Sequence, residues 1–124
     1  MHNEQNKQFD LEERTAKFGE SVINFCRGLP KDEITRLLIN QLTKCATSVG
    51  ANYCEADDAE SPKDFVHKIG ICKKESREAK HFLRMVASAI PEQKEKLREL
   101  WLEAKELNLI FNSIYKKVKN KNKG

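Results

Sequence analysis

Apolar residues recur at helical intervals along almost the whole chain. From Pro62 to Ile90, apolar or small residues form two seven-residue ladders that are offset by three or four positions. Such ladders place one continuous stripe on one side of an α-helix, where it packs against neighbouring helices. The two ladders of this segment are Phe65, Cys72, Ala79 and Val86, and Ile69, Ser76, Leu83 and Ile90.

Three other segments repeat the pattern, so four helices would use nearly all of the chain. The connections between them are about two to five residues long, and such short connections force neighbouring helices to run antiparallel. We therefore predict an all-α protein, folded as an up-down-up-down antiparallel four-helix bundle. The inward positions of the other helices are Leu11, Thr15, Phe18, Val22, Phe25 and Leu29; Leu38, Leu42, Cys45, Val49 and Ala56; and Leu97, Leu100, Ala104, Leu107, Phe111, Ile114 and Val118.

Residues that start or stop helices separate the four segments. Asp10 is expected to cap the first helix, with Glu13 completing a capping box. Ser61 followed by Pro62 is the sharpest start signal, because a cap precedes a proline at the first helical position. The other signals are Gly28 and Pro30 after the first helix, Asp32 before the second, and Pro91 between the third and fourth.

Basic residues are concentrated at the C-terminal end. The chain has 23 lysines and arginines and a net charge of +4. Five of these basic residues lie in the last nine residues, and the other 18 are balanced by 19 acidic residues. We expect a flexible segment over residues 1–9, a bundle over 10–118 and a basic flexible tail over 119–124. Such a tail attracts nucleic acid or an acidic membrane by charge, or is simply a solvated terminus. The five residues are Lys116, Lys117, Lys119, Lys121 and Lys123.

The composition favours a cytoplasmic protein with no membrane segment. No run of about 18 apolar residues is present, and the first ten residues lack the apolar middle of a signal peptide. The four cysteines include no Cys-x-x-Cys pair, so we expect reduced structural thiols. Cys54 alone falls toward an outer face and is expected to react with a thiol probe.

Polar residues interrupt the apolar pattern in the middle of the second and third helices. Gly50 costs about 1 kcal/mol relative to alanine inside a helix, which indicates that another element packs closely there. The inward polar residues are expected to bond one another across the helices and to fix their register, or alternatively to line a small-molecule pocket. No nucleophile with its base lies nearby, so no catalytic residue is assigned. The residues of this expected network are Ser48, Asn52, Glu55, Glu75 and Ser76.

Metal chemistry is not expected. Glu78 and His81 form one Glu-x-x-His unit, and Asp64 with His67 forms a looser one. A two-metal site in a bundle needs such units on two facing helices, whereas both of these lie on the third helix and point outward. We therefore predict no metal ligands and no cofactor.

A basic stripe on the third helix is the candidate nucleic-acid interface. Its residues are spaced to follow a phosphate backbone, although charged helix faces are often merely solvated. The candidate residues are Lys73, Arg77, Lys80 and Arg84.

A second apolar stripe on the fourth helix predicts self-association, because a helix that packs only within its own bundle does not need one. Leu37, Ile39 and Tyr53 of the second helix form the candidate opposing patch, since cyclic assemblies join two different surfaces. The alternative is a broad core in a monomer. The candidate interface residues are Trp101, Leu102, Leu109 and Tyr115.

Two long segments resemble a known family. They are DLEERTAKF, residues 10–18, and QLTKCATSVGANYCEADDAESPKDFVHKIGICKKESREAKHFL, residues 41–83. Both resemble the four-helix-bundle proteins encoded in 23S rRNA intervening sequences, whose typical members have Arg-Ser in place of Lys44 and Cys45. The resemblance implies an antiparallel bundle that assembles into a homopentamer and has no established catalytic residues. The related accessory variability proteins of diversity-generating retroelements form similar pentamers and bind nucleic acid and a reverse transcriptase.

Together these observations predict a non-enzymatic, self-assembling bundle that presents basic surface to RNA, ribosomal RNA included, or to an RNA-handling partner. The alternative is a protein-binding adaptor or accessory subunit without direct nucleic-acid contact. A third hypothesis is an enzyme or ligand-binding bundle that uses the region around Asn52, Glu55 and Glu75.

Overall fold

The structure is a bundle of four α-helices. The computed structural model describes the backbone of residues 4–123 and the side chains of residues 11–121. The helices are α1 (Glu4–Arg27), α2 (Glu33–Asp57), α3 (Pro62–Ala89) and α4 (Lys94–Lys123), with a short 3-10 turn, η1 (Pro91–Gln93), before α4. No strand occurs in the described part of the chain, so the predicted all-α class is confirmed.

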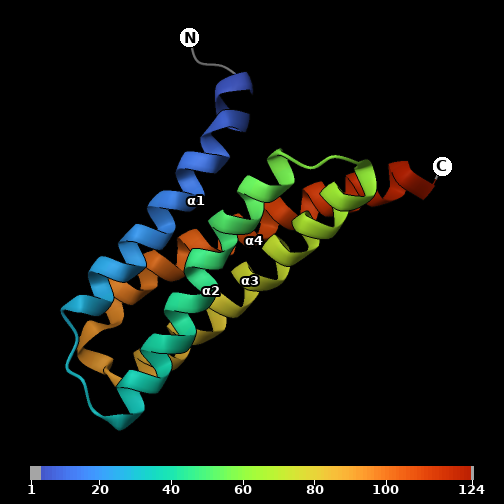
Figure 1. Ribbon diagram of the computed structural model, residues 1–124. Coiled ribbons are helices and arrows are strands. Elements are labelled where there is room, and N and C mark those ends of the chain that lie inside the picture. Colours follow the sequence, from blue (N-terminus) through green and yellow to red (C-terminus); the bar gives the residue numbers. More distant parts are fainter. Residues whose placement is uncertain (1–3, 124) are drawn as a thin grey trace.

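The connections lie at alternate ends of the molecule (Figure 1). The α1–α2 connection and η1 lie at one end, and the α2–α3 connection lies at the other. α3 packs extensively against both α2 and α4, whereas α1 packs mainly against α2 and contacts α4 much less. The first turns of α1 extend beyond the other helices, which leaves α1 the least enclosed member of the bundle.

Helix caps form where the sequence places most of them. The Asp32 carboxylate accepts the Thr35 backbone N–H at 2.8 Å, and Ser61 Oγ accepts that of Asp64 at 3.0 Å with Pro62 at the first helical position. The predicted cap at Asp10 is wrong, because α1 already begins at Glu4. The predicted tail boundary at residues 118/119 falls inside α4, which continues to Lys123.

The core follows the predicted ladders closely. Most of their members are buried, among them Leu42, Ile69 and Phe111. The half-buried members are Phe25, Leu38, Phe65, Ile114 and Val118. Tyr53 departs from the prediction: it is not part of an outer patch but lies in the core.

The tyrosine ring packs against Phe111 of α4. The Tyr53 and Phe111 ring centroids are 5.9 Å apart in a tilted arrangement, a geometry that stabilises aromatic pairs beyond their buried area. Tyr53 therefore links α2 to the far side of the core and is unavailable to a second copy.

Gly50 lies where α1 and α2 approach each other, as its place inside the helix indicated. A Cβ atom at this position would lie 3.3 Å from Thr15 Oγ1 and 3.5 Å from the Thr15 backbone carbon. Thr15 cannot easily give way, because its buried hydroxyl donates to the carbonyl oxygens of Leu11 and Glu12.

We expect Gly50→Val to lower the free energy of unfolding by about 1–3 kcal/mol, the usual range for overpacking a filled interior. Urea denaturation followed by circular dichroism measures the change. The matched control is Ala51→Val, on the exposed side of the same turn. Equal stabilities of the two variants would contradict the close approach of α1 and α2.

Three of the four cysteines are buried and one is exposed, which confirms the predicted pattern. Cys26, Cys45 and Cys72 lie in the core, and Cys54 lies on the surface. Burial raises the pKa of both Cys45 and Cys72 to about 12, so their reactive thiolate forms are scarce at neutral pH.

Brief alkylation at pH 7.5 should therefore add one label to the folded protein, at Cys54, and four labels in denaturant. Mass spectrometry of the intact protein and of its peptides measures both results. A label on Cys45 or Cys72 at the same rate as on Cys54 would show that the bundle opens readily.

Candidate nucleic-acid interface

α3 and α4 border a groove of about 560 Å³ in which every charged side chain is basic. We call it the basic groove. Four cations from α3 form one wall, and two amides and a tyrosine from α4 form the other. Its lining residues are Gly70, Lys73, Lys74, Arg77, Lys80, Asn108, Asn112 and Tyr115.

Two of these lysines form cation–π contacts with aromatic rings of α4. The Lys73 ammonium lies 4.6 Å from the centroid of the Tyr115 ring, and the Lys80 ammonium lies 5.6 Å from that of Trp101. Each such cation–π contact contributes about 0.5–1 kcal/mol at an exposed site. Both lysines are half-buried, so their charges are oriented along the groove walls before any ligand arrives.

The Tyr115 ring lies close to α3 because the facing residue is a glycine. A Cβ atom at Gly70 would lie 3.2 Å from Tyr115 Cε1, closer than an ordinary van der Waals contact. Gly70 therefore lets the ring sit against the α3 backbone, where it supports Lys73.

A buried amide joins the two helices beneath the groove. Asn108 Nδ2 donates to the Lys73 carbonyl oxygen at 2.9 Å and to Ser76 Oγ at 3.1 Å. These bonds fix the position of α4 relative to the segment of α3 that carries the basic residues. Asn108 was not predicted from the sequence, although this residue shares a seven-residue ladder with Trp101 and Tyr115 and that spacing could have identified it.

The predicted basic residues divide between two sites. Lys73, Arg77 and Lys80 lie in the basic groove, whereas Arg84 borders a separate groove of about 460 Å³ nearer the end of α3. We call this second site the apolar groove, because its lining is mainly aliphatic and aromatic. Its lining residues are Leu83, Arg84, Ala87, Lys94, Leu97, Arg98, Trp101 and Leu102.

The predicted polar network does not form one connected unit. Asn52 Nδ2 donates to the carbonyl oxygen and to Oγ of Ser48, both at 2.9 Å, within α2. Glu55 forms an ion pair with Lys68 and thereby connects α2 to α3. The α2 members thus bond locally or at the surface and do not reach Ser76.

The α3 members of that network have different partners. Ser76 is buried and bonds Asn108 of α4, not Asn52 of α2. Glu75 is half-buried, and burial together with the charge of Glu78 raises its pKa.

The predicted interface residues differ in exposure. Leu102 and Leu109 are 45% and 57% exposed, whereas Trp101 and Tyr115 are half-buried beneath lysines. On α2, Leu37 is exposed and Ile39 is half-buried. Ile34, one turn before Leu37, is also exposed and was not predicted from the sequence.

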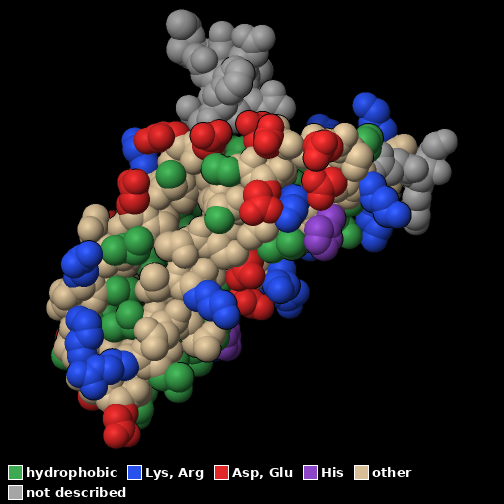
Figure 2. Space-filling model, in the orientation of Figure 1, with side chains coloured by type: hydrophobic (Ala, Val, Ile, Leu, Met, Phe, Trp, Pro, Cys, Tyr) green, Lys and Arg blue, Asp and Glu red, His purple; other side chains and the backbone are tan. Residues whose placement is uncertain are grey.

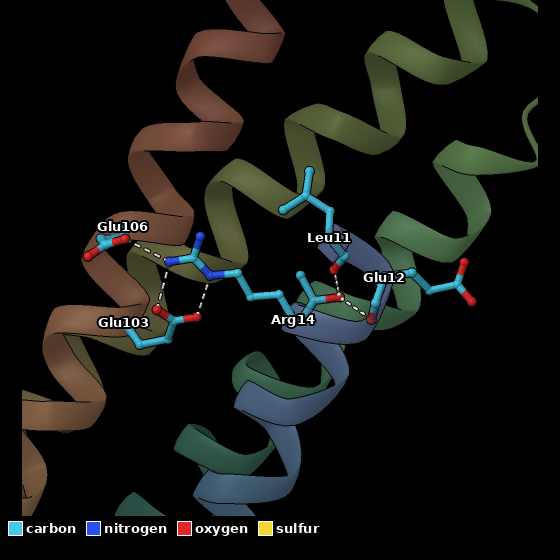
Figure 3. Close-up of polar contacts among 6 residues, drawn as sticks. Leu11, Glu12, Arg14, Glu103 and Glu106 are labelled. Carbon is cyan, nitrogen blue, oxygen red and sulfur yellow. Dashed lines mark hydrogen bonds and ion pairs between the residues drawn. The ribbon is translucent and has the colours of Figure 1, made fainter. Parts of the chain in front are cut away.

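An ion-pair cluster connects α1 to α4 (Figure 3). The Arg14 guanidinium points between two α4 carboxylates, donating to both oxygens of Glu103 at 2.7 and 2.8 Å and to Glu106 at 2.7 Å. The hydrogen bond to Glu103 raises the pKa of Arg14, and the contacts with Glu106 add to this effect. This bidentate pair is the main polar link between two helices that otherwise touch little.

Charges are separated on the molecular surface. On the face shown in Figure 2, acidic side chains gather along the upper edge, over α1 and the α2–α3 connection. Basic side chains gather at the opposite end and around the end of α4. The acidic edge therefore repels a polyanion, whereas the basic regions at the opposite end and around the end of α4 attract one.

Neither a metal site nor a membrane span is found in the described part of the chain. No group of three or more His, Cys, Asp or Glu side chains there is placed to hold a metal ion. His67 and His81 are exposed on α3, as expected. No helix among the described residues is long and apolar enough to cross a bilayer.

Comparison with known proteins places the chain in a family. The sequence model of the 23S rRNA-intervening sequence proteins matches residues 7–121. A solved structure from Bacteroides thetaiotaomicron VPI-5482, a protein of unknown function from the S23 ribosomal protein family, is similar with a TM-score of 0.77 and 26% identity. The similarity covers 85% of this chain and 94% of that one. No curated protein matches. The chain belongs to the 23S rRNA-intervening sequence protein family.

Proposed function

We propose that this protein is a non-enzymatic, cytoplasmic bundle that binds RNA through the basic groove. The observation that carries the proposal is the composition of that groove, which combines four cations with two amides and an aromatic ring and contains no acidic residue. Phosphate contacts supply most of the affinity of proteins for nucleic acid, and aromatic rings add stacking surface.

The shape of the groove favours single-stranded RNA over a duplex. Lys73 and Lys80 are half-buried against the groove walls, and the segment from Gly70 to Lys80 extends about 15 Å along the helix. A flexible single strand can bend into such a groove, whereas the phosphates of a rigid duplex reach protruding charges more readily. The carboxamides of Asn108 and Asn112 border the same space and can contact nucleotides there.

We also propose that the four helices run up-down-up-down and that the protein assembles with itself into a pentamer. The alternate placement of the helix connections supports the topology, and the pentamer rests on the family resemblance. Several copies in one ring would present several basic grooves to one RNA, which raises the overall affinity without any new contact.

Fluorescence anisotropy with a labelled single-stranded RNA, repeated from 50 to 300 mM salt, tests the function. Three phosphate contacts, with Lys73, Arg77 and Lys80, predict a slope of log affinity against log salt near −2 for each groove, since each single-strand contact contributes about 0.7. A duplex of equal length should bind more weakly. Equal affinity for the duplex would overturn the preference for single strands.

Absence of RNA binding at 50 mM salt would overturn the function itself and favour the adaptor hypothesis. The exposed leucines and the apolar groove support that second candidate, since contiguous apolar surface marks protein interaction sites. Identification of a co-purified protein that loses binding when Leu102 is changed to glutamate would then support it.

A further inference from the structure

Two apolar surfaces lie at the end of the bundle that carries the α1–α2 connection and η1. The first consists of Ile34 and Leu37 in the opening turns of α2, which we call the α2 apolar pair. These side chains are 67% and 62% exposed, and their spacing of three residues places them on one side of the helix. Large aliphatic side chains so exposed at adjacent positions mark an interaction surface.

The second surface is the apolar groove between the end of α3 and the start of α4. Leu83, Ala87 and Leu102 contribute to its apolar lining, and its volume of about 460 Å³ accommodates two aliphatic side chains. The charged residues that line it are all basic. An occupant with apolar side chains and a flanking negative charge therefore fits this groove.

The α2 apolar pair has that chemistry. Glu33 precedes Ile34 on the exposed side of the helix, and the Asp32 carboxylate caps the same turn. Lys31 is turned away, because its ammonium donates to the carbonyl oxygen of Cys26 near the end of α1 and to that of Leu29 just after it. Successive residues of a helix are separated by 100° around its axis, so Arg36 lies at a larger angle from the apolar pair than Glu33 does. The charge next to the pair is therefore negative.

We infer that the α2 apolar pair of one copy docks into the apolar groove of a second copy, in a head-to-tail contact. The inference rests on the proposed self-association and does not require that the basic groove binds RNA. Both surfaces lie at the same end of the bundle. In copies related by rotation about an axis parallel to the helices, the two surfaces therefore lie at the same height along that axis. Such a contact closes into a ring when the rotation is a whole fraction of a full turn, whereas a shift along the axis would give a filament.

Cross-linking tests the contact directly. Leu37→Cys and Leu102→Cys are introduced together into a Cys54→Ser background, and the protein is oxidised at micromolar concentration. A ladder of covalent oligomers is expected on a non-reducing gel. The control pairs Leu102→Cys with Glu20→Cys, on the exposed side of α1, and should give no ladder. If light scattering shows that the wild-type protein is an oligomer but the Leu37→Cys, Leu102→Cys variant gives no ladder, the docking contact is overturned and self-association is not.

Complementation provides a second, independent test. Ile34→Glu with Leu37→Glu removes the apolar pair, and Ala87→Glu with Leu102→Glu blocks the groove. Each variant alone should have the mass of one 14.3 kDa chain while keeping its helix content by circular dichroism. In an equimolar mixture, the intact apolar pair of the groove variant can still dock into the intact groove of the other variant. The mixture should therefore form a heterodimer of twice that mass. A mixture that stays monomeric, or a single variant that assembles like the wild type, would overturn the inference; a wild-type monomer would overturn self-association with it.

Discussion

Reversing Lys73 and Lys80 together to glutamate should lower the affinity for single-stranded RNA by more than about 100-fold. Each change removes a phosphate contact and places a negative charge in the groove, and facing like charges cost several kcal/mol. The same two residues are oriented by Tyr115 and Trp101, so the groove loses its most ordered cations. The salt slope should become shallower by about 1.4, as expected for two lost single-strand contacts.

The matched control is Lys17→Glu with Lys63→Glu, which makes the same change in net charge at exposed positions on α1 and in the first turn of α3. This control should weaken binding only modestly. Truncation after Val118 should also have a modest effect, mainly on the association rate, although it shortens α4 and removes the Lys119 contact with Tyr115. RNA affinity that survives the groove reversal and disappears on truncation would assign binding to the C-terminal lysines.

Phe111→Ala should lower the free energy of unfolding by about 3–5 kcal/mol, the range measured when large aromatic side chains are removed from protein cores. Phe111 is the largest fully buried side chain of the described residues, and its ring packs against Tyr53. Its removal therefore leaves a cavity and also breaks a contact between α2 and α4. Urea denaturation at one fixed protein concentration measures the effect, because self-association makes apparent stability depend on concentration.

Phe82→Ala is the control for that measurement, since Phe82 is only half-buried and packs edge-on against the exposed His81. Its loss should cost clearly less. A Phe111 variant no less stable than the Phe82 variant would mean that the centre of the bundle repacks freely.

Much of the fold could be predicted from the sequence because its ladders are long and regular. The seven-residue pattern of α3 alone assigns a residue such as Leu83 to the core, without knowledge of the neighbouring helix. The caps at Asp32 and Ser61 are likewise local. Asp10 and Glu13 carry an equally good local pattern, but helix α1 begins earlier, at Glu4. Local signals show where a helix can start and do not exclude an earlier start.

Polar partners were harder to predict, because they depend on which helices face each other and how each is rotated. Ser76 was expected to bond residues of α2, yet its side chain meets Asn108 of α4. Asn52 was expected to reach α3 and instead bonds Ser48 on its own helix. Seven-residue spacing shows that a side chain points inward, but it does not identify the helix that the side chain meets.

The separation of Arg84 from the other basic residues has a similar cause. Along α3, Arg84 continues the angular position of Lys73 and Arg77, so spacing alone groups all of them. In the structure, the Lys80 side chain lies over Trp101, and the lining beyond this point is mainly apolar. The identity of the facing α4 residues, and not the α3 pattern, sets the end of the basic groove.

The Trp101 ring connects the two grooves, because it lines the apolar groove and contacts Lys80, which lines the basic one. A neighbouring copy docked in the apolar groove would restrict this ring and, through it, the lysine that meets RNA. Assembly and RNA binding would then be thermodynamically linked, and such linkage acts equally in both directions. If docking holds Lys80 in its RNA-binding position, RNA lowers the protein concentration at which rings form, and the protein assembles preferentially where its RNA is present.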